Sequence, residues 1–285
     1  MDEKQTALEA GAVVGPFRLR RRLGEGAAGI VWLAERERDG FLVALKLLRP
    51  GVAGDETARR RFAREARAAA EVEHPHLVPV LDAGEDRGRA WLATRYVDGR
   101  TLADRLAGGP LTLAELLTLV AEVAAGLQAL HERGLIHRDV KPSNIMLDAG
   151  GHAALADFGL AKGAVYSALT RPGQVLGTLA YMAPELIRGE PASPASDLYA
   201  LGCVAFEGLA GVPPFAGRGV LALGLAHLQD DPPDPVAERP EVPPGVGWTV
   251  LSALAKEPGR RPTTTVAFAN LLATAARGTP GAAPG

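Results

Sequence analysis

Residues 137–144 read H-R-D-V-K-P-S-N, which brings an acid, three basic side chains and an amide into eight positions. Lysine and asparagine are uncommon in this chain, since it has 26 Arg but only five Lys and two Asn. Lys141 and Asn144 are therefore informative, because each places a residue type that is rare in this chain within one short loop. A connecting loop seldom combines these residue types, so the stretch predicts a loop with a chemical role.

A second acidic segment, D-F-G at 157–159, follows this loop. Asp139 can accept a hydroxyl proton, and Lys141 can neutralise charge on a phosphoryl group during transfer. Asn144 and Asp157 can offer the oxygen ligands that Mg²⁺ prefers. Together the two segments predict metal-assisted phosphoryl transfer.

Two N-terminal motifs are ambiguous when each is taken alone. Residues 24–29 read G-E-G-A-A-G, and the strand-like I-V-W-L at 30–33 excludes a dinucleotide fold, which needs a helix there. The glycines form either an ordinary hairpin turn or a turn whose N–H groups close over phosphates. Lys46 ends V-A-L-K at 43–46, where it either reaches water or contacts phosphates, in the latter case held by Glu65.

Composition excludes several other classes of protein. The 285 residues carry a formal net charge of -2, are 47% hydrophobic and include one cysteine, Cys203, which we expect to be buried. Collagen, coiled coil, wholesale disorder, a disulfide framework and a general nucleic-acid surface are excluded. The start of the chain has no apolar signal-peptide region, and the apolar stretches 113–130 and 198–210 contain glutamates. We therefore expect buried helices, no membrane contact and a cytoplasmic location.

Hydrophobic periodicity predicts a small β-rich part followed by a larger helical part. Strands are expected near 17–23, 30–34, 41–48, 77–81 and 90–97, and helices at 56–73, 112–131, 193–209, 220–228, 248–255 and 266–276. Trp32, Trp91 and Trp248 are expected in the core, and the histidines outside 137–144 at the surface or in packing. The expected organisation is a flexible arm (1–15), an N-lobe (16–97), a C-lobe (98–276) and a disordered Gly/Pro/Ala tail (277–285).

The ordered motifs, with A-P-E at 183–185 completing them, resemble the eukaryotic-like protein kinases over residues 17–276. The sequence around these motifs is most similar to that of bacterial Ser/Thr protein kinases. The resemblance implies an α+β bilobal protein kinase fold, with a five-stranded antiparallel sheet plus one helix and a larger, mainly helical lobe. Lys141, two residues after Asp139, implies Ser/Thr rather than Tyr specificity.

Carried over position by position, the resemblance implies a catalytic set of Asp139, Lys141, Lys46 and Glu65, and a metal pair of Asn144 and Asp157 for Mg²⁺ or Mn²⁺. Residues expected to contact ATP are Leu23, Gly24, Glu25, Gly26, Ala27, Ala28, Gly29, Val31, Ala44, Lys46, Thr94, Arg95, Val97 and Met146. Glu185 is expected to form a buried ion pair with Arg261, Asp197 to hold the catalytic-loop backbone, and Thr178 to bond Asp139 and Lys141.

Arg138 precedes Asp139, which in this family implies control by phosphorylation of the loop after residue 157. Thr170 is the favoured acceptor and Ser167 the next, with autophosphorylation, in a possible homodimer, as the implied route. Protein substrates with Ser or Thr acceptors are the implied partners. Two alternatives stay open: a nucleotide-binding pseudokinase scaffold, and a small-molecule kinase, which would lack the equivalents of Lys141 and Glu185.

Overall fold

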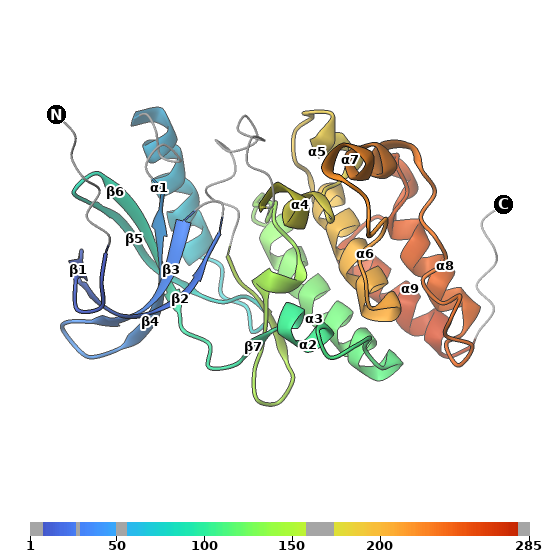
Figure 1. Ribbon diagram of the computed structural model, residues 1–285, viewed down its shortest axis with the longest axis horizontal. Helices are drawn as coiled ribbons and strands as arrows, with labels where there is room; N and C mark the ends of the chain where they lie inside the picture. Colours follow the sequence, from blue (N-terminus) through green and yellow to red (C-terminus); the bar gives the residue numbers. More distant parts are fainter. Residues whose placement is uncertain (1–7, 27–28, 50–55, 158–173, 279–285) are drawn as a thin grey trace. The chain divides into compact units, whose positions relative to one another are not determined.

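The computed structural model describes residues 8–26, 29–49, 56–157 and 174–278 (Figure 1). The chain divides into two compact units. Among the described residues, the first unit contains 8–71 and 79–97, and the second contains 72–78 and 98–278.

The first unit is built on one antiparallel sheet with the strand order β1-β2-β3-β4-β6-β5. Its elements are β1 (Val13–Val14), β2 (Phe17–Glu25), β3 (Gly29–Arg36), β4 (Leu42–Leu48), β5 (Val80–Asp86), β6 (Arg89–Arg95) and the helix α1 (Glu56–Ala70). Alternate residues of the central strands are buried on one face, and Phe17 packs edge-on against Trp91 there at 5.3 Å between ring centroids. The opposite face carries more polar residues, as expected for a sheet with two different environments.

The sheet has one strand more than the sequence predicted. Val13 and Val14, assigned to the flexible arm, pair with Arg18 and Phe17 to form β1. Val14 is almost fully buried, so its apolar contacts explain why this segment is ordered. The strand predicted at 77–81 was also misplaced, because β5 begins at Val80 and residues 72–78 belong to the second unit.

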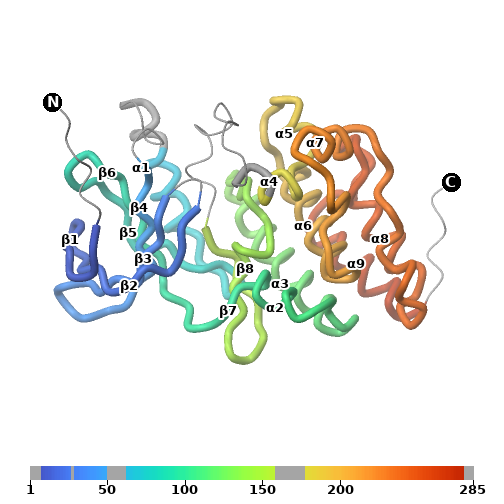
Figure 2. Tube along the Cα trace, in the orientation of Figure 1, coloured from blue at the N-terminus to red at the C-terminus, as the bar shows by residue number. Residues whose placement is uncertain are grey.

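The second unit is mainly helical (Figures 1 and 2). Its helices are α2 (Leu102–Leu106), α3 (Leu113–His131), α4 (Gln174–Leu179), α5 (Pro184–Ile187), α6 (Pro194–Ala210), α7 (Val220–Gln229), α8 (Pro244–Ala253) and α9 (Thr265–Ala276), with the 3-10 turns η1 (Pro142–Asn144) and η3 (Pro258–Arg260). A small antiparallel sheet contains β7 (Arg100–Thr101), β8 (Ile145–Leu147) and β9 (Ala153–Leu155). The short elements α2, α4, α5 and β7–β9 were not predicted, because their periodic patterns span too few residues.

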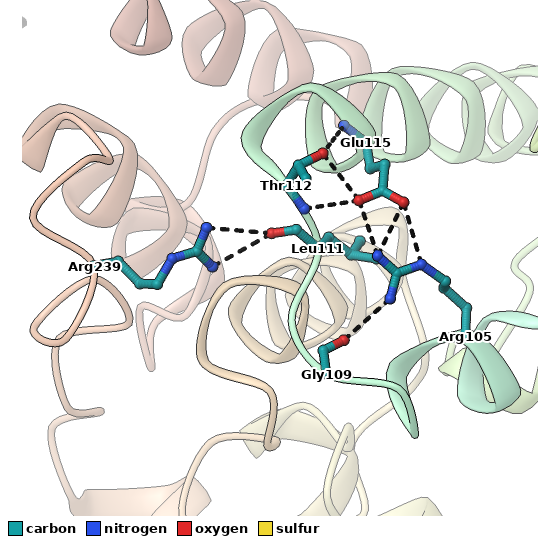
Figure 3. A network of polar contacts seen from close by, with 6 residues as sticks. All are labelled: Arg105, Gly109, Leu111, Thr112, Glu115 and Arg239. Carbon is teal, nitrogen blue, oxygen red and sulfur yellow. Dashed lines mark hydrogen bonds and ion pairs between the residues drawn. The ribbon is translucent and has the colours of Figure 1, made fainter.

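The start of α3 is fixed by side chains from three segments (Figure 3). The Thr112 hydroxyl accepts the backbone N–H of Glu115, while the Glu115 carboxylate accepts the N–H of Thr112. Arg105 binds the same carboxylate through two nitrogens, and Arg239 donates to the Leu111 carbonyl. The two bonds between Thr112 and Glu115 satisfy N–H groups that a helix start otherwise leaves unpaired, and the two arginines tie this helix start to other segments.

Among the described residues, α3 is also the one helix long and apolar enough to cross a membrane by length and composition. Its buried residues, which include Val120, Val123 and Leu127, form the core of the second unit with α6 and α9. Cys203 on α6 is fully buried, as predicted. Trp248 was predicted to be a core residue, but it is 48% exposed on α8.

Candidate active site

The backbone of the loop 137–144 is held by one carboxylate from α6. Asp197 accepts the N–H of His137 through Oδ2 and the N–H of Arg138 through Oδ1, each at 2.8 Å. Arg138 adopts a left-handed conformation with φ of 65°, which is unfavourable for a residue with a side chain. The two charge-assisted hydrogen bonds from the neighbouring amides therefore stabilise a strained turn just before Asp139.

Two histidines complete the support of this turn. His131, at the end of α3, lies with Nε2 2.9 Å from Oδ2 of Asp197. His137 is fully buried, and Nε2 lies 3.1 Å from the Ala156 carbonyl. Burial lowers the pKa of His137, so it supports the loop as a neutral ring. The contact of His131 with Asp197 was not predicted, since His131 was grouped with surface and packing residues.

Asp139 and Lys141 lie side by side after the turn. Lys141 Nζ is 3.0 Å from Oδ2 of Asp139 and 3.4 Å from the Thr178 hydroxyl. Both side chains are partly exposed, with 10% of Asp139 and 20% of Lys141 accessible. The predicted contact of Lys141 with Thr178 is confirmed. The arrangement presents a carboxylate and a fixed positive charge to the same accessible space.

Asn144 and Asp157 are brought together by the backbone. The Ala156 N–H donates to the Asn144 carbonyl at 2.7 Å, which places Asp157 next to η1. The Asn144 Nδ2 donates to the Asp139 carbonyl at 2.8 Å, so its Oδ1 is directed to the other side of the amide. Asp157 has φ of 63° and is half-buried. One neutral and one anionic oxygen group on adjoining segments fit a hard cation such as Mg²⁺.

In the first unit, several predicted nucleotide-binding residues share one face of the sheet. Val31 pairs with Lys46, and Ala44 pairs with Thr94, whose hydroxyl lies 3.4 Å from the Ala44 carbonyl. Most of their neighbours along each strand face the buried core on the other side. Leu23 on β2 is 36% exposed. The face therefore combines small and branched apolar side chains with one lysine, a mixture typical of small-molecule sites.

The glycine motif divides into two parts with different roles. A Cβ on Gly24 or Gly26 would meet no heavy atom within 4 Å, so the chain there leaves open space above the backbone. A Cβ on Gly29 would lie 2.0 Å from the Leu47 carbonyl oxygen, so Gly29 is required for the pairing of β3 with β4. Glu25 pairs with Arg22 and Arg49.

The remaining predicted site residues are distributed over both units. Glu65 is half-buried on α1, Arg95 ends β6, Val97 follows that strand, and Met146 lies on β8. Ala27, Ala28, Ser167 and Thr170 lie outside the described residues.

The ion pair between Glu185 and Arg261 is present and fully buried. Arg261 binds both carboxylate oxygens of Glu185, at 2.7 and 2.8 Å, and donates further hydrogen bonds to the carbonyls of Ala195, Ala255 and Lys256. Its guanidinium also lies 4.9 Å from the centre of the Tyr199 ring. The charges are thus fully hydrogen-bonded, which is what a buried ion pair needs to be tolerated.

A pocket that the sequence did not predict adjoins Lys141. It has a volume of about 330 Å³ and is lined by α2 residues, by Lys141 to Ser143 and by Tyr181 and Glu207. The Tyr181 hydroxyl donates to Glu207 at 2.5 Å, and burial raises the pKa of that carboxyl. The pocket adjoins Lys141 and has room for a small ligand or a short chain segment.

These features define the bilobal fold of a protein kinase: an antiparallel sheet unit with one helix, a mainly helical unit, and the loop just described. The protein kinase domain family matches residues 17–271, and the chain belongs to that family.

Its relatives include Ser/Thr protein kinases of Mycobacterium tuberculosis. PknD is 41% identical over 89% of this chain and 38% of its own length, and PknJ is 39% identical over 95% of this chain and 47% of its own length. The crystal structure of the PknI kinase domain from that organism has a TM-score of 0.78 and 35% identity, covering 95% of this chain and all of that domain. The chain is therefore similar to bacterial Ser/Thr kinase domains and spans less than half the length of these two curated relatives.

Proposed function

We propose that this chain transfers the γ-phosphoryl group of ATP to Ser or Thr hydroxyls of protein substrates, with Mg²⁺ or Mn²⁺ as cofactor. The observation that supports this most strongly is the joint placement of Asp139, Lys141, Asn144 and Asp157 on two adjoining backbone segments. Ser/Thr specificity is supported by the names of the relatives and by Lys141.

In this mechanism Asp139 accepts the proton of the attacking hydroxyl through a carboxylate oxygen. The hydroxyl oxygen forms a bond to the γ-phosphorus while the bond from that phosphorus to the β–γ bridging oxygen breaks, and ADP leaves with the electron pair. Lys141, held by Asp139 and Thr178, offsets negative charge on the phosphoryl group during transfer.

Asn144 and Asp157 would hold the metal ion, which neutralises phosphate charge when it is bound. Lys46, assisted by Glu65, would bind the α- and β-phosphates. Leu23, Val31, Ala44 and Met146 would pack on the adenine, with Thr94 to Val97 along its edge.

Three further parts of the proposal concern the whole protein. We propose that the kinase phosphorylates its own loop at Thr170 or Ser167, that this reaction proceeds between two copies, and that the catalytic domain acts in the cytoplasm. A phosphate on this loop would be recruited by Arg138, which is partly exposed beside Asp139.

The test is incubation of the purified chain with γ-labelled ATP and Mg²⁺, beside Asp139→Asn and Lys46→Met. Label on Ser or Thr in the wild type alone is the expected result. ATP binding without transfer, under conditions in which a related kinase is active, would instead support a pseudokinase scaffold. Labelling of small molecules but no protein would support the other alternative.

A further inference from the structure

A buried histidine in the helical unit has no part in the mechanism above. His227 on α7 is completely inaccessible to solvent. Its Nδ1 lies 2.8 Å from the Tyr199 hydroxyl on α6, and its ring lies edge-on to Phe215 at 5.1 Å. Burial and the neighbouring Lys256 ammonium lower the pKa of His227 to about 4, so the imidazole is neutral.

The second ring nitrogen has an unusual environment. Among the described residues, Nε2 of His227 is a buried polar atom without a hydrogen bond. The Ala180 backbone raises the pKa of the imidazole against the effect of burial, so it lies near the ring, although Nε2 has no partner at hydrogen-bond geometry. Leu179 reaches the same helix, since its side chain lies 3.9 Å from where a Cβ on Gly224 would stand. The inner face of α7 is therefore packed against residues 179–180.

This segment connects to the catalytic loop on one side and to the buried ion pair on the other. Thr178, two residues before Ala180, contacts Lys141, and Glu185, five residues after it, binds Arg261. Arg261 lies over the ring of Tyr199, whose hydroxyl contacts His227. Arg261, Tyr199 and His227 thus form one continuous chain of contacts that meets the segment 178–185 at two separate points.

The surroundings of His227 hold it in one place. Phe215 has φ of 61°, an unfavourable conformation for an aromatic residue. Its ring is nevertheless packed against His227 and has the ammonium of Lys256 4.9 Å from its centre. A strained residue persists only where its neighbours fix it, so the Phe215 ring is held against the imidazole.

We propose that His227 is a positioning residue for substrate: its Nε2–H is a hydrogen-bond donor for the Ala180 carbonyl and fixes the segment 178–185 when a peptide binds beside Lys141. The Tyr199 hydroxyl donates to Nδ1 and thereby keeps the proton on Nε2. An unpaired buried donor favours a small movement that satisfies it, so closure of this bond favours the peptide-bound segment. The inference rests on the proposed kinase function, because the role given to His227 is expressed only when a peptide substrate binds.

Two substitutions of His227 separate positioning from packing. His227→Gln places an amide nitrogen near the position of Nε2, whereas His227→Asn places one near Nδ1 and cannot reach Ala180. Both should lower the melting temperature, because both disturb the buried contacts. His227→Asn should raise the KM for a peptide substrate about five- to tenfold, the change expected for one lost hydrogen bond. His227→Gln should stay within about twofold of wild type.

The KM for ATP should not change in either variant, and His152→Asn, at an exposed histidine of the same unit, is the matched control. Equal peptide KM values for the Asn and Gln variants, raised or not, would overturn the proposal and leave His227 as a packing residue.

Hydrogen exchange provides a readout that does not need activity. The amides of 179–182 should exchange faster in His227→Asn than in His227→Gln, measured with a saturating peptide substrate and without ATP. Unchanged exchange in His227→Asn would contradict the inference even for an inactive chain. Absence of phosphoryl transfer in the wild type, with the exchange difference present, would contradict the proposed function alone.

Discussion

The ammonium group of Lys141 lies 3.0 Å from Oδ2 of Asp139, and the Thr178 hydroxyl holds it on the other side. The lysine is therefore oriented before any substrate binds, and its charge is available beside the carboxylate. Preorganised charge of this kind stabilises a transition state without further rearrangement.

Removal of either partner should reduce kcat. We expect Asp139→Asn to lower kcat by a factor of about 10² to 10⁴, the usual contribution of a general base. Lys141→Met should lower it by about 10², as the loss of one fixed charge or donor at a transition state does. Steady-state kinetics with a peptide substrate measures both, and Arg277→Met, at an exposed cation after α9, is the control. Wild-type kcat in either variant would contradict the assigned roles.

Asp197→Asn should damage both stability and activity. The carboxylate accepts the N–H groups of His137 and Arg138, but an amide offers only one oxygen and turns its own N–H groups toward the other donor. We expect a loss of about 2–4 kcal/mol in the free energy of unfolding, because a buried donor is left unpaired and a charge-assisted bond is lost. Because Arg138 is strained, we expect kcat to fall as well.

Denaturant unfolding and steady-state kinetics measure these two effects. Asp234→Asn is the matched control, because this exposed carboxylate accepts a single turn N–H from Val236. Equal stability losses in the two variants would show that the loop does not depend on Asp197.

How much the sequence predicts depends on the range over which a residue acts. The loop 137–144 and the helix starting after Thr112 depend on residues that are neighbours in the sequence. The role of the loop and the start of the helix could therefore be inferred from short motifs. The ion pair of Glu185 with Arg261 was inferred only through the family resemblance, since 76 positions separate its partners.

Other features could not be predicted because they are tertiary. The sequence predicts a loose arm at Val13–Val14, because the strand β2 that pairs with it is brought alongside only in the folded protein. Trp248 was predicted to lie in the core because it is large and apolar, yet it lies on an exposed side of α8. His131 and His227 have no motif, and only the packing of α3 and α7 against α6 shows that each contacts a polar group there. Such contacts have no local signal in the chain.

Buried and exposed ion pairs should differ sharply in their effect on stability. Glu185→Gln leaves the Arg261 guanidinium buried without its counter-charge, so we expect a loss of about 3–5 kcal/mol in the free energy of unfolding. Arg18→Ala removes the pair of Arg18 with Glu37, whose side chains are 45% and 42% exposed, and should cost less than about 1 kcal/mol. Urea titrations of both variants test the comparison. A loss below 1 kcal/mol for Glu185→Gln would mean that the guanidinium becomes hydrated or finds another partner.

Acid should destabilise the fold partly through His227. Its pKa is lowered to about 4 in the folded protein, against about 6.5 in the unfolded chain, so the unfolded state binds more protons as the pH falls below 6.5. The stability contributed by the neutral ring is present in full above pH 6.5 and is lost as the pH falls toward 4. The full span corresponds to about 3 kcal/mol, of which about 2 kcal/mol is lost by pH 5. His137, whose pKa burial also lowers, acts in the same direction.

Unfolding free energies measured between pH 7 and 5 should therefore fall less steeply in His227→Gln than in wild type. His152 has the opposite sign, because Glu122 raises its pKa and its contribution appears on acidification. His152→Asn should accordingly make the fall slightly steeper. The same slope in His227→Gln and wild type would show that His227 already takes up a proton near pH 6.5 in the folded protein, and that its ring is not held neutral.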